Sequence, residues 1–303
     1  MGKLFSGKAV VYILATLSIL FWGISYIWSN ELIAKGIPIS YFVSIRIIIA
    51  GVILFLANAL IRNVQKMQRK DILWFIVLAL CEPFLYFICE TYGIKETASP
   101  TISSMLIASV PIFSIMAGYF IFKENFSLEN LLGVICTLAG IGLVLYTKTD
   151  GGVGEHFWFG ILLLLGAVIT EVIQAAITKK LSADYNSANI AMYQFCIGAL
   201  FFIPLFLSDG LRGFDADVYF SWDVWRPILC LAVFCSAFAF FLWAKTIKDL
   251  GVAKSSVFLA MICVVTALAS VLTGQEMLTS LQWGGVGISV VGIIFSQCTK
   301  KKA

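Results

Sequence analysis

Three carboxylates and one guanidinium interrupt stretches of the chain that are otherwise apolar. Glu82 and Glu90 lie in "LCEPFLYFICETYGI", residues 80–94, while Arg46 and Glu171 lie inside two further apolar runs. An ionised carboxylate in hydrocarbon is costly unless it has a partner, a proton or contact with water. If Arg46 neutralises one glutamate, at least one other must be protonated, solvated or paired with a bound substrate. These residues predict proton exchange or charge recognition in an apolar setting.

Two functional hypotheses and one structural alternative follow from this excess of negative charge. In the first, a glutamate exchanges protons and couples transport to the proton gradient. In the second, the glutamates receive an amine or another cationic group, and Arg46 is free to hold a carboxylate. In the structural alternative, Arg46 and Glu90 form an ion pair that only supports the fold.

The spacing around Glu82 predicts one wall of a cavity. If the segment begins near residue 71, Glu82 lies about 16 Å along a helix, close to the middle of a hydrocarbon core about 30 Å thick. Glu82, Tyr86 and Glu90 are four residues apart, so they share one helical face. Pro83 predicts a kink, because it removes an intrahelical hydrogen bond that neighbours or water must replace. Glu90 lies nearer the outer surface, and its alternative is an interfacial carboxylate.

Aromatic and polar residues on other apolar runs complete the predicted cavity. Such rings stack on apolar substrates or contact cations, although membrane aromatics more often anchor helices to lipid or pack them. The polar members are therefore the stronger candidates. The set comprises Trp22, Tyr26, Asn30, Gln174, Asn189, Tyr193, Gln194 and Trp243.

Composition places these residues in a membrane protein. Sixty per cent of the 303 residues are hydrophobic and 13% are charged, whereas a soluble domain is about a quarter charged. Long continuous apolar runs indicate helices, because a barrel would need short alternating segments. We predict an all-α fold with ten transmembrane helices. Their ranges are 8–29, 39–61, 71–93, 98–122, 128–147, 157–178, 187–207, 226–247, 252–274 and 281–298.

The distribution of basic residues predicts the orientation. Of the 21 lysines and arginines, 15 fall on one side of the predicted spans, 5 on the other, and Arg46 inside the second span. By the positive-inside rule, both termini are cytoplasmic in a multi-pass protein of the cell (inner) membrane.

The chain contains an internal repeat. A shift of 152 residues superposes polar and glycine positions that apolar sequence alone would not align: Ser103-Ser104 on Ser255-Ser256, Glu124 on Glu276, Gly133 on Gly285 and Gly140 on Gly292. Residues 1–150 and 151–303 then hold five spans each, and an odd number per half requires opposite orientations. This inverted repeat predicts a substrate site near the midplane, between the halves. The glycine-rich runs are expected to pack or dimerise the fifth helices.

Several of these segments resemble one family. "FWGISYIWSN", "ISYFVSIRIIIAG" and "TYGIKETASPTISSMLIASVPIFSIMAGYFIFKENFSLENLLGVICTLAGIGLVL" are similar to EamA-type members of the drug/metabolite transporter superfamily. That family has small residues followed by proline, here Ala108 and Pro111, and then a glutamate, here Glu124. The resemblance implies a ten-helix carrier, often an exporter, of small metabolites such as amino acids, working by alternating access. In the second repeat, Cys263 stands at the position that corresponds to Pro111, so a symmetric kink is not expected.

Other functional classes lack their motifs. There is no HExxH or GxSxG, the single histidine is His156 in a loop, and the eight cysteines lie in apolar runs. We therefore expect no enzyme activity, metal, cofactor or disulfide framework. Small molecules and the lipid bilayer are the expected partners, nucleic acid is not, and monomer and homodimer both remain open. A channel-like facilitator or a non-transporting scaffold is the alternative to a secondary transporter, and an intramembrane enzyme is the weaker one.

Overall fold

Helices make up the described fold. The computed structural model describes residues 8–114, 116, 128–150, 152–210, 215–250 and 252–297, and these contain no strand. Glu124, Cys298 and the end of the predicted span 98–122 lie outside the described residues. The first half contains α1 (Lys8–Ala34), α2 (Ile39–Leu60), η1 (Arg69–Asp71), α3 (Ile72–Ala79), η2 (Leu80–Leu85), α4 (Tyr86–Thr97), α5 (Pro100–Ala108) and α7 (Leu128–Asp150). The second contains α8 (Phe157–Leu181), α9 (Ser187–Leu205), η3 (Phe206–Gly210), α10 (Ala216–Tyr219), α11 (Trp222–Cys230), η4 (Leu231–Phe238), α12 (Ala239–Leu250), α13 (Val252–Leu272) and α14 (Ser280–Gln297).

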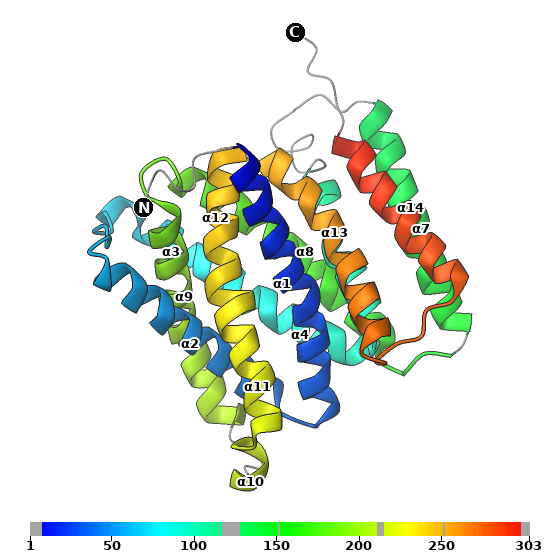
Figure 1. Cartoon of the computed structure of the whole chain (residues 1–303), viewed down its shortest axis with the longest axis horizontal. Helices are drawn as coiled ribbons and strands as arrows, with labels where there is room; N and C mark the ends of the chain where they lie inside the picture. The colour runs from blue at the N-terminus through cyan, green and yellow to red at the C-terminus, as the bar shows by residue number, and fades with distance from the viewer. Residues whose placement is uncertain are drawn as a thin grey trace.

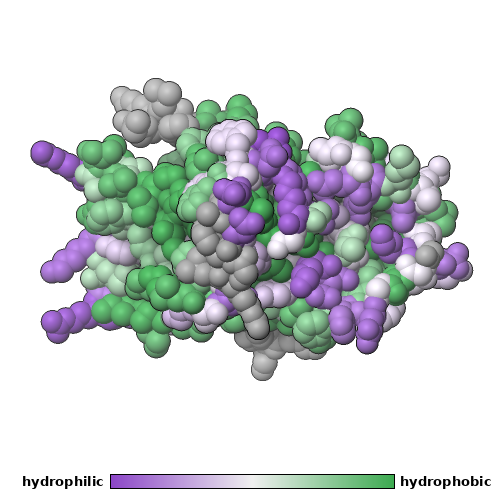
Figure 2. Space-filling model, turned by 90° about the horizontal axis from the view of Figure 1, so that it is seen from below, coloured by the Kyte–Doolittle hydropathy of each residue, from purple (hydrophilic) through white to green (hydrophobic). Residues whose placement is uncertain are grey.

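The helices have the length and exterior of membrane spans. Seven described helices are long and apolar enough to cross a bilayer, and shorter apolar helices at Pro100–Ser114, Phe258–Leu272 and Ser280–Ser296 fall on the other three predicted spans. Large apolar side chains such as Leu162, Ile169 and Leu200 are exposed. Figure 2 shows the end of the bundle where α10 lies, with hydrophilic residues gathered over its middle and right. The all-α multi-pass prediction is confirmed, while the count of ten spans stays a prediction.

The two halves contact each other in a reciprocal way (Figure 1). The shift of 152 residues takes α4 onto α12 and takes η2 into η4. In the structure α4 packs on α8, and α12 packs on α1. Likewise η2 contacts α8 and α9, whereas η4 contacts α1 and α2. In each half, the segment that corresponds to the third predicted span therefore packs against the first two predicted spans of the other half.

The two proline positions differ from their counterparts. The backbone of Glu82, before Pro83, leaves helical geometry with φ −147° and ψ 124°. Near Pro111, α5 ends at Ala108 and a turn at Ser109 precedes further helix. By contrast, α13 runs through Cys263 without interruption. The helix break that follows Ala108 in the fourth span is thus absent from α13, the corresponding helix of the second half.

Glycines let α7 and α14 lie backbone to backbone at the edge of the bundle (Figure 1). A Cβ on Gly140 would lie 2.5 Å from the carbonyl oxygen of Gly285 and 2.7 Å from the amide nitrogen of Ser289. Gly133 and Gly292 face each other in the same way. Such contacts are typical of small-xxx-small packing within membranes. The two predicted fifth helices therefore pack on each other within one chain.

The close contact between α7 and α14 predicts that alanine substitutions at two glycines of α7 will change stability unequally. Gly140→Ala should destabilise the protein by about 1–3 kcal/mol relative to Gly142→Ala, because overpacking forces the backbones apart. Gly142 has no atom within 4 Å of the added Cβ, so it controls for the change in helix propensity. Unfolding of the purified variants in detergent measures the difference. Equal stability would show that α7 and α14 do not meet at Gly140.

Candidate functional site

One buried cavity collects much of the predicted site at the junction of the two halves. Its walls come from α1, α2, η2, α4 and α8, with apolar contributions from Phe240 of α12 and Leu259 of α13. The cavity has a volume of about 20 Å³, counted as space for the centres of water molecules. Seven predicted residues line it: Trp22, Tyr26, Arg46, Glu82, Tyr86, Glu90 and Glu171.

The helix break at Glu82 places its carboxyl group in this cavity. Glu82 is 2% exposed, and it lines the cavity together with Glu171 of α8. Two ionised carboxylates that line the same apolar cavity repel each other, which favours a proton on one of them. The Oε2 atom of Glu82 has no hydrogen-bond partner among the described residues. The pair therefore provides a site where one proton can be held.

Neighbours stabilise the broken backbone. Gln194 donates from Nε2 to the carbonyl oxygen of Glu82 at 3.0 Å. Gly198 gives Pro83 its space, since a Cβ there would lie 2.4 Å from the proline Cγ. Both residues belong to α9, so the second half positions the acidic residue of the first. Gln194 thus satisfies one backbone carbonyl at the break, that of Glu82.

Arg46 is a buried cation that has no carboxylate within 4.0 Å among the described residues. Its Nε donates to Ser236 Oγ at 2.6 Å, and its guanidinium carbon lies 4.1 Å from the centre of the Phe87 ring. Nη1 has no hydrogen-bond partner in the described structure. The four described ion pairs within 4.0 Å are Glu31–Lys35, Asp184–Lys70, Glu31–Arg226 and Asp249–Lys245. The alternative of a structural Arg46–Glu90 ion pair is therefore not supported.

Glu90 faces the cavity and not the outer surface. It is 4% exposed, and its Oε1 accepts a hydrogen bond of 3.0 Å from the hydroxyl of Tyr86. The hydroxyl of Tyr26 is buried and has no hydrogen-bond partner among the described residues. Both tyrosines line the same cavity as the glutamate. The interfacial alternative for Glu90 is therefore not supported.

Trp22 and Trp243 form an aromatic layer beside the acidic groups. Trp22 donates from Nε1 to the Cys235 carbonyl oxygen at 3.0 Å, and its ring centre lies 5.1 Å from Phe240 and 5.2 Å from Trp243. Trp243 does not line the main cavity; it lines a second, smaller cavity that also includes Glu171.

The remaining predicted residues lie elsewhere. Asn30 donates to Gln275 Oε1 at 2.9 Å. Asn189 and Tyr193 bind the segment between α2 and α3: Asn189 Oδ1 accepts from the Gln65 amide at 2.9 Å, and the Tyr193 hydroxyl donates to the Gln65 carbonyl at 2.5 Å. Gln174 is buried on α8 but does not line the main cavity. Their roles in a substrate site stay predictions.

Sequence reasoning missed Ser236, the hydrogen-bond acceptor for Arg46. The two residues are 190 positions apart, and a serine in an apolar run carries no signal of its own. The internal repeat offered one, because the shift of 152 residues takes the Glu82–Pro83 segment onto η4, where Ser236 lies.

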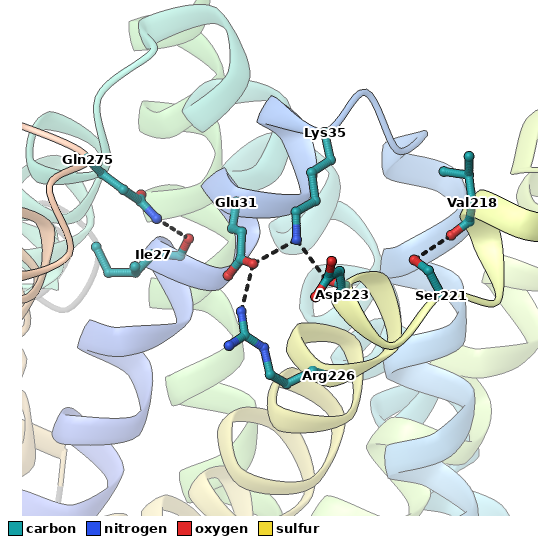
Figure 3. A network of polar contacts seen from close by, with 8 residues as sticks. All are labelled: Ile27, Glu31, Lys35, Val218, Ser221, Asp223, Arg226 and Gln275. Carbon is teal, nitrogen blue, oxygen red and sulfur yellow. Dashed lines mark hydrogen bonds and ion pairs between the residues drawn. The ribbon is translucent and has the colours of Figure 1, made fainter.

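A polar network closes the bundle at the end of α1. Glu31 Oε1 accepts from Lys35 Nζ and from Arg226 Nη2, both at 2.8 Å, and Lys35 Nζ also donates to the Asp223 carbonyl at 2.8 Å (Figure 3). Gln275 Nε2 donates to the Ile27 carbonyl at 3.1 Å. These bonds tie α1 of the first half to α11 and α13–α14 of the second. We refer to this region as the Glu31 end.

A second network closes the opposite end, where α8 reaches Lys179 and Lys180. The Tyr185 hydroxyl donates to Asp71 Oδ2 at 2.9 Å and accepts from the Gln68 amide at 2.9 Å. Asp71 and Asp223 are related by the shift of 152 residues, although Asp71 contributes its carboxylate and Asp223 its backbone carbonyl. We refer to this region as the Lys179 end. Hydrogen bonds thus join the two halves at both ends of the bundle.

Comparison with known proteins agrees with this architecture. A relative from Bacillus subtilis (strain 168), named "Uncharacterized transporter YetK", is 27% identical over 277 residues, covering 90% of this chain and 82% of that protein. The "Probable terminal-alkyne amino-acid exporter" of Streptantibioticus cattleyicolor is 23% identical over 250 residues, covering 82% of this chain and 80% of that protein. A solved structure, titled "Crystal structure of protein", has the same fold, with a TM-score of 0.71, 16% identity, and 95% of this chain and 96% of that chain covered.

The family assignment follows from a tandem match across the chain. The sequence profile of the EamA-like transporter family matches residues 9–146 and again residues 158–297. The resemblance seen in the sequence is thus confirmed. The chain belongs to the EamA-like transporter family, and it is a multi-pass membrane protein of a transporter family.

Proposed function

We propose that this protein is a secondary transporter that exports small organic metabolites, with amino acids as the substrate class, by alternating access. It comprises two inverted five-helix repeats, residues 1–150 and 151–303, with both termini in the cytoplasm. The reciprocal packing of α4 on α8 and of α12 on α1 supports the repeat. The exporter named among the relatives supports the direction and the substrate class.

The observation that carries this proposal is a buried cavity with separated charges of both signs. Glu82, Glu90 and Glu171 line it together with Arg46, whose Nη1 lacks a hydrogen-bond partner among the described residues. A zwitterionic amino acid complements this arrangement, with its ammonium group on a glutamate and its carboxylate on Arg46. Guanidinium groups bind carboxylates in a fork geometry, which favours this orientation.

Opening of the cavity is part of the mechanism. A volume of about 20 Å³ holds roughly one water molecule and no amino acid. The networks at the Glu31 end and at the Lys179 end join the two halves on both sides of the cavity. Each must separate in turn, so the occluded form lies between an outward-open and an inward-open form.

Proton coupling follows from the carboxyl pair. When a substrate ammonium group reaches Glu82 and Glu171, it supplies the positive charge that the shared proton supplied before. The proton then leaves, and it returns once the substrate has been released. Export of one substrate would thus be exchanged for import of one proton.

Counterflow tests the transport step. Proteoliposomes preloaded with an unlabelled amino-acid mixture should take up the same labelled amino acids several times faster than vesicles without preloading. Vesicles that lack the protein provide the baseline. Uptake that preloading does not accelerate would indicate a channel-like facilitator. Uptake at the baseline under both conditions, from protein that remains folded, would indicate a scaffold.

A further inference from the structure

The buried face of α8 is polar on one side of Glu171. Gln174 and Thr178 lie three and seven residues beyond Glu171, so the three share a face. Gln174 is 3% and Thr178 1% exposed, and the helix then reaches exposed Lys179 and Lys180. At about 1.5 Å per residue, Thr178 lies about 10 Å from Glu171 along the axis. Polar atoms therefore extend from the central cavity toward the Lys179 end.

These polar atoms have the environment of water sites. Gln174 Oε1 and Thr178 Oγ1 are buried and have no hydrogen-bond partner in the described part of the chain. In contrast, Thr170 on the same helix donates back to the Ala167 carbonyl at 2.8 Å. Buried polar atoms without protein partners are normally bonded to ordered water. Gln174 and Thr178 therefore mark positions where water can enter the helix packing.

A second cavity lies beside the first. It shares Val110, Glu171 and Leu259 with the main cavity and is also lined by Trp243. The indole Nε1 of Trp243 is buried without a hydrogen-bond partner among the described residues. The volume is about 10 Å³, close to the space of one water molecule. A water molecule here would accept a hydrogen bond from Trp243 beside the Glu171 carboxyl group.

The same face of α8 is apolar on the N-terminal side of Glu171. Leu164, Ala167 and Val168 precede Glu171 and are fully buried. Leu164 packs so closely on α4 that a Cβ on Gly93 would lie 2.6 Å from its Cγ. On this side, the described residues of that α8 face present apolar side chains. The contrast between the two sides gives the path a direction.

We propose that α8 carries a one-sided water path from Glu171 to the Lys179 end, along which the shared proton of Glu82 and Glu171 exchanges with the cytoplasm. This rests on the proposed proton-coupled transport. A proton that the pair has taken up from the outer side leaves along this hydrogen-bonded water to the cytoplasmic solution when a substrate binds from that side. The other ionisable groups that face this pair across the main cavity are Glu90, Arg46, Tyr26 and Tyr86.

Reactivity of introduced thiols tests the path without a transport assay. Thr178→Cys and Leu164→Cys lie seven residues on either side of Glu171, and each would be made in a background with the eight native cysteines replaced. A small thiol reagent should modify position 178 at least about tenfold faster than position 164, because only the former contacts water. Thiol reaction in detergent-solubilised protein measures both rates. Equal rates would overturn the proposal.

Proton flux tests the role of the path. The substitution Thr178→Val should slow substrate-driven proton movement into or out of proteoliposomes by about tenfold, with counterflow at equal pH changed less than about twofold. Thr170→Val is the matched control on the same helix. Unchanged proton flux, or counterflow reduced to the same extent, would overturn the path. Wild-type counterflow without proton movement would also overturn it, although transport itself would stand; absence of wild-type counterflow would instead contradict the proposed function.

Discussion

Replacing Glu82 by glutamine is expected to abolish the pH dependence of transport and to reduce net export at least about tenfold, because ionisable residues deep in a membrane protein are generally functional. Glutamine has the shape of the protonated glutamate but cannot release a proton. Glu82 and Glu171 line the same cavity, and Glu82 Oε2 has no hydrogen-bond partner among the described residues, so the amide can occupy the same position. The expected loss therefore concerns proton exchange and not folding.

The measurement is substrate flux across a series of pH values in proteoliposomes. Glu155→Gln removes an exposed glutamate from a loop and controls for the change in net charge. Thermal unfolding of both variants should resemble the wild type. If Glu82→Gln retained the wild-type rate and the wild-type pH profile, Glu82 would have no part in the mechanism.

Residue type and spacing predicted the central group of the site. A charge inside a long apolar run must be solvated or paired, and this single constraint identified Arg46, Glu82, Glu90 and Glu171, which all line one cavity. The four-residue spacing of Glu82, Tyr86 and Glu90 also predicted that these residues line one cavity, as they do. However, the chain breaks at Glu82, so local backbone geometry and not continuous helical periodicity places that carboxyl group.

Uncharged polar residues were predicted less well, for a physical reason. Asn189 and Tyr193 have the spacing of a polar stripe, yet their partners are backbone groups of the segment between α2 and α3. An amide or hydroxyl group can be satisfied by any nearby loop, and the path of a loop is not contained in helical periodicity. A buried charge has far fewer acceptable environments than a neutral polar group. The ionisable residues were therefore the more informative part of the sequence.

Substitution of Arg46 should separate recognition of the substrate carboxylate from recognition of the amine. Arg46→Lys keeps the charge but loses the planar fork that can bind a carboxylate through two nitrogens. It should weaken competition by an amino acid in the counterflow assay about tenfold or more, since hydrogen bonds to charged groups contribute about 1.5–3 kcal/mol. Competition by the decarboxylated amine of the same side chain should change little.

The contrast between these two competitors makes the result specific. Ser236→Ala removes the 2.6 Å acceptor of Arg46 Nε without touching the charge, so it should weaken amino-acid competition in the same direction but less. Arg46→Gln should abolish amino-acid transport, because the cavity would keep three glutamates and no cation. If Arg46→Lys weakened competition by the amino acid and by the amine equally, the guanidinium would not contact the carboxylate. Arg46 would then be a structural cation held by Phe87 and Ser236, and charge recognition would rest on the glutamates alone.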